Sequence, residues 1–579
     1  MKYNNFILNS PGQRLFRNLI LTVIVFSGLS TEVAQAQVKQ SVKKRLSTRP
    51  NIIFIMSDDH SYQTISAYGS QISQLAPTPN IDKIAKGGII YNKAFVENSL
   101  CTPSRAALMT GLYSHQNGQR QLAEGIDSTK VFFSELLQKE GYQTALVGKW
   151  HMSIDPKGFT YYHILDDQGQ YYNPTFKGPD TGNKFVQEEG YATDLITTHA
   201  LEFLNARDKS KPFSLMIHHK APHRNWMPDG KYLDLYNDVN FPLPETFFDD
   251  YDSRCSAAKT QKMSISKDME LVQDLKVVEL KGQAETPYDK LSYAFLMGEL
   301  RRLTPSQRAV WDKHYKPRNE EFLRAKLKGR DLEIWKYQQY IKDYLRCVKS
   351  VDQSVGEILK YLKDNGLEEN TMIVYTSDQG FFMGEHNWFD KRFMYEESFR
   401  TPLLIKYPKA IPPGTKSDAL VQNIDFAPTF LGLAGIKQPG EMVGRSLVPT
   451  FGGTKPEGWR KDLYYHYYDY PAFHLVRKHD GVSTERYKLI HFYGEGGIRG
   501  AKTKYQTTPG TREYTVLQLI NKVGYVTNDA DINCNELYDL KNDPHELHNL
   551  YGVKGYEKIT AALQKRLDEY RKTLKVDEY

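Results

Sequence analysis

The segment NIIFIMSDD, residues 51–59, decides the fold class of this 579-residue chain. Its first six residues form a short apolar run rich in β-branched side chains, which is typical of a parallel strand buried on both faces. Similar runs at 142–147, 213–218 and 371–376 alternate with helical patterns such as 191–206. This alternation predicts an α/β fold with a large, doubly wound mixed sheet flanked by helices.

The pattern changes beyond about residue 455. Residues 486–493 and 536–540 are typical of strands, and 556–574 of a closing helix, so we expect a smaller antiparallel sheet there. The expected domains are therefore a main domain over 51–455 and an α+β subdomain over 456–579. Residues 240–345 are charged, rich in tyrosine and mostly helical by pattern, which predicts an insertion in the main domain.

Composition excludes several classes of protein. With 40% hydrophobic and 25% charged residues, the chain supports a sizeable core and is not disordered. The net charge of +7 is small for this length and scattered, so it does not indicate nucleic-acid binding. It is compatible with a polyanionic substrate. The four cysteines are too few and too widely spaced for a disulfide scaffold or a zinc site.

The first 36 residues are typical of a secretory signal. Basic residues precede an apolar stretch at 19–29, and Ala34-Gln-Ala36 resembles a cleavage site. The stretch is too short to span a bilayer, which disfavours the alternative of a membrane anchor. We therefore expect a signal peptide over 1–36, a linker over 37–50, and an exported mature chain without a membrane span.

Polar side chains follow four of the predicted strands at the point where each strand ends. The segments are Ser57-Asp-Asp59, Gly148-Lys-Trp-His151, His219-Lys-Ala-Pro-His223 and Ser377-Asp-Gln-Gly380. In open α/β sheets, ligands bind beyond the carboxyl ends of the strands. Acids, bases and amides are thus expected at one edge of the sheet, which indicates a catalytic constellation.

Four of these residues are hard oxygen ligands: Asp58, Asp59, Asp378 and Gln379. Such a set suits Ca²⁺ or Mg²⁺ and not zinc. The alternative is that one or two of the acids cap helices. Three carboxylates packed together repel one another unless a cation neutralises them.

The segment Cys101-Thr-Pro-Ser-Arg105 begins a predicted helix. The free N–H groups and the dipole of that terminus favour an anion beside Cys101, and Arg105 lies one turn further along. The alternative is a buried, inert cysteine.

The stretch CTPSRAALMTG, residues 101–111, resembles the signature of the formylglycine-dependent type I sulfatases, a family of the alkaline phosphatase superfamily. The resemblance extends from residue 51 to about 550 and implies an alkaline-phosphatase-like fold. Further matching segments are Asp58-Asp-His60, Thr78-Pro-Asn-Ile-Asp82, Gly148-Lys-Trp-His151, Ala221-Pro-His223, Ser377-Asp-Gln-Gly380, Gly384-Glu-His386 and Lys391-Arg-Phe-Met-Tyr-Glu-Glu397.

The resemblance implies a role for each matching residue. Cys101 would be oxidised by a formylglycine maturation enzyme, and the hydrated aldehyde would be the nucleophile. His151 would assist that hydrate, and His223 would protonate the leaving alcohol. The resemblance also implies one Ca²⁺ ion, whose ligands would be Asp58, Asp59, Asp378, Gln379 and the modified Cys101. Three cationic side chains would bind the sulfate oxygens: Arg105, Lys149 and Lys391.

Some positions depart from the family pattern. Gln379 stands where many members have Asn, and Met109 stands where Leu is commoner. His218 and His219 are alternatives to His223, which is preferred because it follows Ala-Pro as in the family.

Within the family, residues 391–397, 463–469 and 536–540 resemble bacterial sulfatases of sulfated glycans, and most of all the N-acetylglucosamine-6-sulfatase-like group. The resemblance implies a sulfuric ester hydrolase, exo-acting on a sulfated oligosaccharide that carries a sugar such as N-acetylglucosamine-6-sulfate. The signal peptide separately predicts that the enzyme is periplasmic. The candidates for contact with the sugar are Asp390, His466, His474 and His479.

Three alternatives to this function remain at this stage. The first is a sulfatase of another polysaccharide, such as a marine galactan, ulvan or a glycosaminoglycan. The second is a phosphatase or phosphodiesterase, although such relatives use Thr or Ser with two zinc ions. The third is an inactive glycan-binding homologue, the state that an unmodified Cys101 would produce.

Overall fold

The computed structural model describes residues 49–283, 287–522 and 530–579. The predicted signal peptide and nearly all of the predicted linker lie outside the described residues. Residues Pro50–Tyr579 form one compact unit, so the expected domain boundary near residue 455 stays a prediction. Among the described helices, we find none that combines the length and the apolar character needed to cross a membrane.

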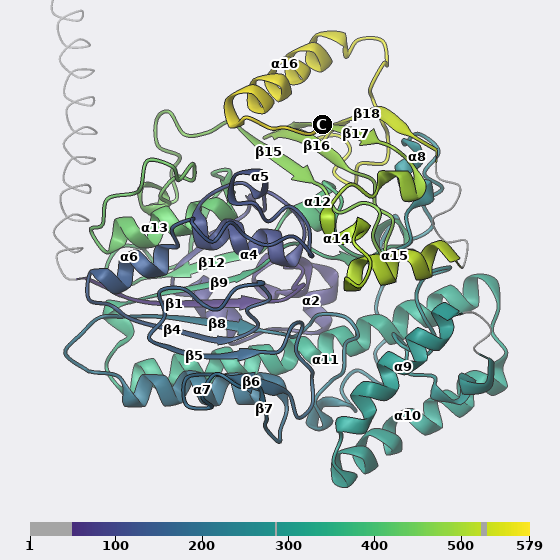
Figure 1. Ribbon diagram of the computed structural model, residues 1–579, viewed down its shortest axis with the longest axis horizontal. Coiled ribbons are helices and arrows are strands. Elements are labelled where there is room, and N and C mark those ends of the chain that lie inside the picture. Colours follow the sequence, from purple (N-terminus) through teal and green to yellow (C-terminus); the bar gives the residue numbers. More distant parts are fainter. Residues whose placement is uncertain (1–48, 284–286, 523–529) are drawn as a thin grey trace, which may run out of the picture. The chain divides into compact units, whose positions relative to one another are not determined.

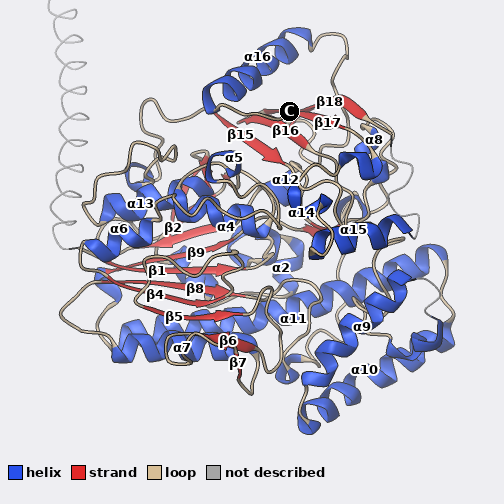
Figure 2. Cartoon of the chain, in the orientation of Figure 1, coloured by secondary structure: helices blue, strands red, loops and turns tan. Residues whose placement is uncertain are grey.

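A ten-stranded mixed sheet forms the centre of this unit (Figures 1 and 2). Its five central strands are parallel to one another, and β12, β6 and β7 run antiparallel to their inner neighbours. The order across the sheet is β13 (Thr415–Ser417), β2 (Ile89–Tyr91), β12 (Leu403–Lys406), β9 (Thr371–Ser377), β1 (Asn51–Ser57), β8 (Phe213–His219), β4 (Gln143–Gly148), β5 (Tyr161–Leu165), β6 (Thr175–Lys177) and β7 (Val186–Gln187).

Helices cover both faces of the sheet, as doubly wound topology requires (Figure 1). On one face lie α7 (Ala192–Ala206) and the long α11 (Gly329–Asp364), which pack against each other. On the other face lie α4 (Cys101–Thr110), α6 (Phe133–Lys139) and α13 (Phe426–Leu433). The predicted fold class is thereby confirmed.

Burial on both faces explains the continuous apolar runs of the central strands. All seven residues of β1 are buried, and Ile52, Ile53 and Phe54 have no exposed surface. Each such side chain contributes roughly 1.5–3 kcal/mol when it is fully buried. The middle of the sheet therefore anchors the loops that follow its strands.

A second, four-stranded antiparallel sheet lies near the C-terminus, as expected. It consists of β15 (Asp462–Tyr467), β16 (His479–Thr484), β17 (Tyr487–Gly494) and β18 (Ile532–Asp539), and α16 (Glu557–Leu574) packs on it. A disulfide between Cys255 and Cys534 ties β18 to the segment before α8 (Ser256–Thr260).

The expectation of a mostly helical insertion is correct only for its second half. Helices α9 (Pro287–Arg302) and α10 (Pro305–Ala325) precede α11, but in residues 240–277 the one helix is α8. Pro242 and Pro244 cannot donate helical hydrogen bonds, and side chains such as Gln338 bind the backbone of this stretch instead.

After β2 the chain leaves the main sheet, and β3 (Ala94–Phe95) pairs with β14 (Val421–Gln422). The remaining short elements are α2 (Gln71–Leu75), α3 (Ile81–Lys86), α5 (Ser114–Asn117), β10 (Phe382–Met383), β11 (Phe389–Asp390), α12 (Glu396–Phe399), α14 (Lys504–Thr507) and α15 (Arg512–Lys522).

We expect Gly148→Ala to destabilise the fold far more than Gly141→Ala. Both glycines have positive φ, 95° and 86°, so both variants carry similar backbone strain. A Cβ on Gly148 would lie 2.0 Å from the carbonyl oxygen of His218 in β8, whereas Gly141 has nothing within 4 Å. In chemical denaturation, the free energy of unfolding should fall by about 2 kcal/mol or more further for Gly148→Ala than for Gly141→Ala. Equal losses would contradict this account of the β4–β8 contact.

Candidate active site

The acids that follow two neighbouring strands converge at one edge of the main sheet. Strands β1 and β9 are parallel and in register, with Ser57 opposite Ser377, so the residues after them meet. The backbone N–H of Asp59 donates to Asp378 Oδ1 at 3.1 Å. Asp58, Asp59, Asp378 and Gln379 are all at most 1% exposed.

These residues form a set of oxygen donors that fits a hard cation. Carboxylate oxygens of Asp58, Asp59 and Asp378 lie within 4.8 Å of one another. Two further buried acceptors, Asp58 Oδ1 and Gln379 Oε1, have no hydrogen-bond partner. Leaving such an acceptor unsatisfied costs about 1–3 kcal/mol, and a cation that accepts oxygen ligands would satisfy both. The helix-capping alternative fails for Asp58 and Asp59, because Ser61 caps the turn that follows them.

Three buried cations face the three carboxylates, one to each. Lys391 Nζ lies 2.7 and 2.8 Å from the two oxygens of Asp59, and Arg105 Nη2 lies 2.9 Å from Asp378 Oδ2. The ammonium of Lys149 contacts Asp58. The sequence segments that supply these charges are far apart, and only the fold brings them together.

The pKa values of the carboxyl groups record their crowding. Burial, together with the charges of Asp58 and Asp378, raises the pKa of Asp59 to about 8, although Lys391 opposes the shift. Burial and Asp58 raise the pKa of Asp378 to about 6. Burial alone would also raise the pKa of Asp58, but Lys149 and its neighbours hold it well below the ordinary value. Near pH 7, Asp59 therefore favours the protonated form unless a cation binds it.

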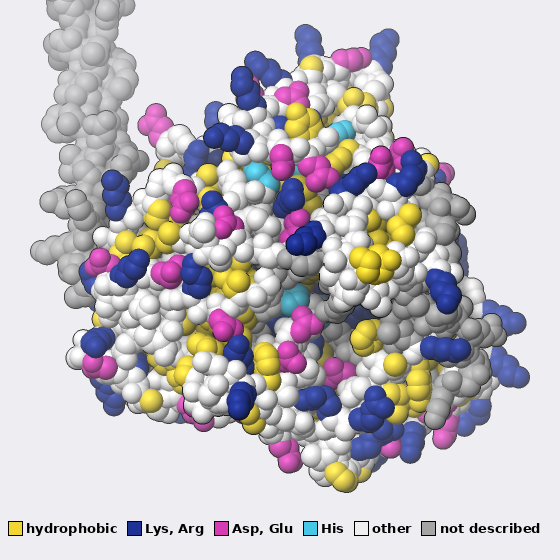
Figure 3. Space-filling model, in the orientation of Figure 1, with side chains coloured by type: hydrophobic (Ala, Val, Ile, Leu, Met, Phe, Trp, Pro, Cys, Tyr) yellow, Lys and Arg dark blue, Asp and Glu magenta, His cyan; other side chains and the backbone are white. Residues whose placement is uncertain are grey.

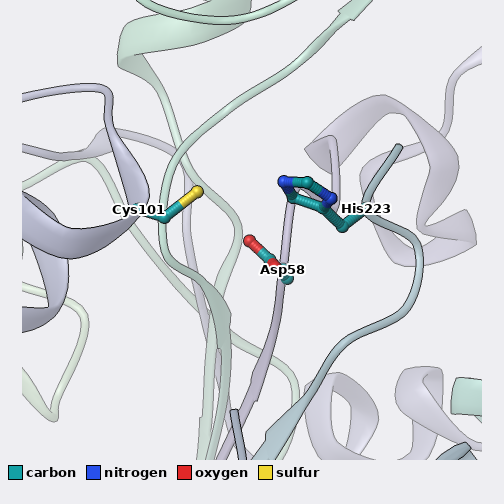
Figure 4. A group of neighbouring side chains, drawn as sticks. All are labelled: Asp58, Cys101 and His223. Carbon is teal, nitrogen blue, oxygen red and sulfur yellow. The ribbon is translucent and has the colours of Figure 1, made fainter. Parts of the chain in front are cut away.

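Cys101 is the first residue of α4 and points toward Asp58 and His223 (Figure 4). Burial and the charge of Asp58 raise the pKa of its thiol far above the ordinary value. A thiolate nucleophile is thus disfavoured at this position. The helix start is held by Ser104, whose hydroxyl donates to the carbonyl oxygen of Asp378.

Asn423 completes that support and could not be found from the sequence. Its Nδ2 donates to Ser104 Oγ at 2.9 Å from a segment more than 300 residues away. No motif marks it, because its role depends on the packing of α4 against the turn before α13.

Of the three neighbouring histidines, His223 lines the cavity that Cys101 opens into. His223 Nδ1 lies 2.6 Å from the carbonyl oxygen of Arg224, which can only accept, so Nδ1 carries a proton. Its Nε2 lies 3.7 Å from Asp59 Oδ2. Burial lowers the pKa of His223 well below the ordinary value, although Asp58 opposes the shift.

His218 and His219 point elsewhere. His218 Nδ1 lies 3.1 Å from the carbonyl oxygen of Lys149, beneath the site. His219 Nε2 lies 3.1 Å from the hydroxyl of Ser354 on α11.

His151 lies beside the helix start. Its Nδ1 is 3.2 Å from Thr102 Oγ1 and its Nε2 is 3.4 Å from Asp167 Oδ1. Burial and the charge of Lys149 lower its pKa to about 4. It is therefore neutral near pH 7 and can accept a proton.

A cavity of about 450 Å³ opens above these residues, a size suited to one sugar unit. Figure 3 shows acidic, basic and histidine side chains gathered around a hollow near the middle of one face. The insertion forms part of the wall of the cavity. The wall residues that it contributes are Gln273, Ser292, Phe295 and Glu299.

Two of the four candidate sugar contacts line this cavity. Asp390 Oδ2 lies 3.3 Å from His474 Nε2, and Asp390 Oδ1 lies 3.2 Å from Nε of Arg392, a lining residue that sequence reasoning missed. Arg224 was missed as well.

The structure does not bring the other two candidates to the cavity wall. His466 is buried between Tyr464 and Tyr493 in the C-terminal sheet. His479 Nε2 accepts the backbone N–H of Met394 at 3.1 Å and so braces the segment that carries Lys391. The sequence of a tyrosine-rich strand does not show which face of the sheet a histidine occupies. Residue type alone therefore could not distinguish the two candidates that line the cavity from the two that do not.

Comparison with known proteins places the chain in a family. The family described as Sulfatase matches residues 50–436, and the C-terminal region of N-sulphoglucosamine sulphohydrolase matches residues 384–499 and 512–573. An N-acetylglucosamine-6-O-sulfatase of Bacteroides thetaiotaomicron is 43% identical over 538 residues, which cover 92% of this chain and 88% of that relative. The N-acetylglucosamine-6-sulfatase of Capra hircus is 26% identical over 87% of this chain and 80% of that relative.

Solved structures agree with these matches. A protein in complex with its substrate, D-glucosamine-2-N,6-O-disulfate, superposes with a TM-score of 0.80 at 43% identity, covering 92% of this chain and 99% of that one. A phosphonate monoester hydrolase of Silicibacter pomeroyi, at a TM-score of 0.60 and 18% identity over 90% and 95% of the two chains, shares the fold alone. Since its sequence and its fold both match, the chain belongs to the sulfatase family of the alkaline phosphatase superfamily and is a sulfuric ester hydrolase.

Proposed function

We propose that this sulfatase removes the 6-O-sulfate from N-acetylglucosamine or a related N-substituted glucosamine at the end of a sulfated glycan. The observation that carries the proposal is the meeting of Cys101, Lys391 and His223 in one cavity of sugar size. The 43% identical relative that acts at this position supports the choice of sugar. Asp390 and His474, which line the same cavity, are proposed to bind its hydroxyl groups.

The chemistry requires two groups that the chain's residues fit. Formylglycine at Cys101 would supply a hydrated aldehyde as the nucleophile in place of the thiol. Ca²⁺ supplies positive charge beside the diol and the sulfate oxygens. Its proposed ligands are Asp58, Asp59, Asp378 and Gln379, with the modified Cys101.

The cations bind and orient the sulfate. Lys149 and Lys391 are proposed to contact its oxygens, where charge builds up in the transition state, and Arg105 holds Asp378 and reaches the same region. His151, which is neutral, is positioned to accept the proton of the attacking hydroxyl.

His223 is proposed as the general acid. The bond between sulfur and the sugar oxygen breaks, and that oxygen leaves as an alkoxide, which is a poor leaving group without a proton. Since Nδ1–H is bonded to the carbonyl of Arg224, the proton on Nε2 of the doubly protonated ring is the one that faces the site. Burial lowers the pKa of His223 and so disfavours the doubly protonated ring. A sulfate anion bound beside the ring would raise that pKa and favour protonation.

We propose that the protein is exported to the periplasm and matures there or on the way. The disulfide between Cys255 and Cys534 is the kind of bond that persists in oxidising compartments. A formylglycine-generating enzyme is the partner that the role of Cys101 requires.

Matured enzyme should release sulfate from N-acetylglucosamine-6-sulfate with a kcat/KM about tenfold or more above that for the 3-sulfated isomer, because a sugar bound in one orientation presents a single sulfated hydroxyl group to Cys101. Peptide mass spectrometry of the same sample should show that Cys101 has lost its thiol. Cys347, which is equally buried on α11, is the matched control and should keep its thiol. Sulfate release with an intact thiol at Cys101 contradicts the mechanism, and equal rates on both isomers contradict the proposed substrate.

Calcium should raise the melting temperature more at pH 8 than at pH 5. Without the ion, the folded-state pKa values of Asp59, about 8, and Asp378, about 6, lie above the ordinary 3.8. The folded state then holds extra protons, and its stability falls as pH rises through this window. Calcium binds the ionised groups and removes that loss, so its stabilising effect grows with pH.

The measurement is differential scanning calorimetry of chelated and calcium-loaded protein at both pH values. Asp378→Asn should lose most of the calcium response. Asp343→Asn, which alters a buried carboxylate in α11 paired with Lys276, should keep it. A calcium response that is equal at both pH values would count against the carboxylate cluster as the binding site.

His223→Ala should slow hydrolysis of a sugar sulfate by about 10²–10⁴-fold in kcat. The loss should be much smaller on an aryl sulfate, whose phenolate leaves without a proton. Steady-state kinetics on both substrates separate the two cases. A loss of equal size on both substrates would assign the proton donor to another residue.

A further inference from the structure

A second cavity of about 430 Å³ adjoins the one that contains Cys101. The two share walls contributed by three separate segments of the chain: Leu122, residues 166–168 and Phe473. His151 lines the second cavity, and Thr102, which contacts His151, is the neighbour of Cys101. A ligand in the second cavity therefore lies directly beside the reacting unit.

Apolar side chains make up part of the wall of the second cavity. Ile154, Leu165 and Leu517 contribute aliphatic side chains, and Phe473 and Phe185 contribute rings. Phe185 is 45% exposed, which is unusual for a phenylalanine, and lies at the rim. Such surfaces suit the C–H face of a sugar ring or an apolar aglycone.

The charges of the second cavity disfavour an anion. Its wall contains Asp155, Asp166, Asp167 and Asp469. Among the described residues of this wall, Lys177 is the one lysine or arginine, and its Nζ lies 2.6 Å from Asp155 Oδ1.

The first cavity differs in this respect. Its wall contains as many basic as acidic side chains, four of each. The basic side chains are Lys220, Arg224, Lys391 and Arg392. Lysine and arginine side chains thus equal the acids in number in the first cavity and are outnumbered by acids in the second. Asp166 and Asp167 line both cavities, and Asp469 Oδ2 lies 3.3 Å from Nη1 of Arg392 in the first.

We propose that the second cavity binds the unit adjoining the sulfated sugar and selects an uncharged one, such as a neutral hexose or an apolar aglycone, over a uronate or a second sulfated sugar. This inference rests on the proposed function, because it defines the substrate class of the same site. Carboxylates in the wall repel an anionic neighbour, while the apolar surface binds a neutral one.

The test compares three substrates that carry the same 6-sulfated N-acetylglucosamine. One is the methyl glycoside, one is linked to glucose, and one is linked through the same bond to glucuronate, so that the disaccharides differ only at carbon 6 of the second sugar. We expect kcat/KM for the glucose-linked substrate to be about fivefold or more above both others. High salt should narrow the gap between the two disaccharides, because it screens exposed carboxylates.

Matched variants locate the effect. Phe185→Ala should reduce the ratio of kcat/KM between the glucose-linked substrate and the methyl glycoside at least threefold. Phe248→Ala is the control, since Phe248 is 46% exposed, also lies beside a cationic side chain, and lines neither cavity. The double variant Asp155→Asn with Asp166→Asn should raise activity on the glucuronate-linked substrate relative to the glucose-linked one.

The outcomes separate the inference from the function on which it rests. Equal kcat/KM for all three substrates, or a preference for glucuronate, overturns the inference and leaves the 6-sulfatase activity standing. Release of sulfate from none of them overturns the proposed function, and the inference with it. A ratio that Phe185→Ala and Phe248→Ala change equally also overturns the assignment of the second cavity.

Discussion

The mutual repulsion of three buried carboxylates is the constraint on which the rest of the site depends. Asp58, Asp59 and Asp378 lie together because β1 and β9 are adjacent and in register. Burying charges of one sign is tolerated only when opposite charges are close, and here one buried cation faces each carboxylate. Two oxygen acceptors are still unsatisfied, which leaves the site with a place for a divalent ion.

This arrangement also explains why a cysteine at the start of α4 is unsuited to act as a thiolate. The carboxylates that favour a cation raise the pKa of the thiol, as burial does. A neutral diol in the same place avoids that penalty, because it needs no charge until His151 accepts a proton. The preference for a cation and the unsuitability of a Cys101 thiolate are thus two consequences of one cluster.

The fold supplies the scaffold, and the loops and the insertion supply the substrate contacts. The same architecture occurs in a phosphonate monoester hydrolase, so the sheet does not decide the reaction. Reaction type follows from the residues after β1, β4, β8 and β9. The wall of the cavity beside Cys101 comes partly from α9 of the insertion and from the segment around His474.

The sequence by itself determined the central strands and the residues that follow them, since burial on both faces requires long apolar runs and the ligands stand immediately after those runs. It could not identify strands such as β5 and β12, whose short runs become strands only by pairing with neighbours. It could not separate Asp390 and His474, which line the cavity, from His466 and His479, which do not. Nor could it find Asn423. These residues are selected by contacts between segments far apart in the chain, and such contacts leave no local pattern.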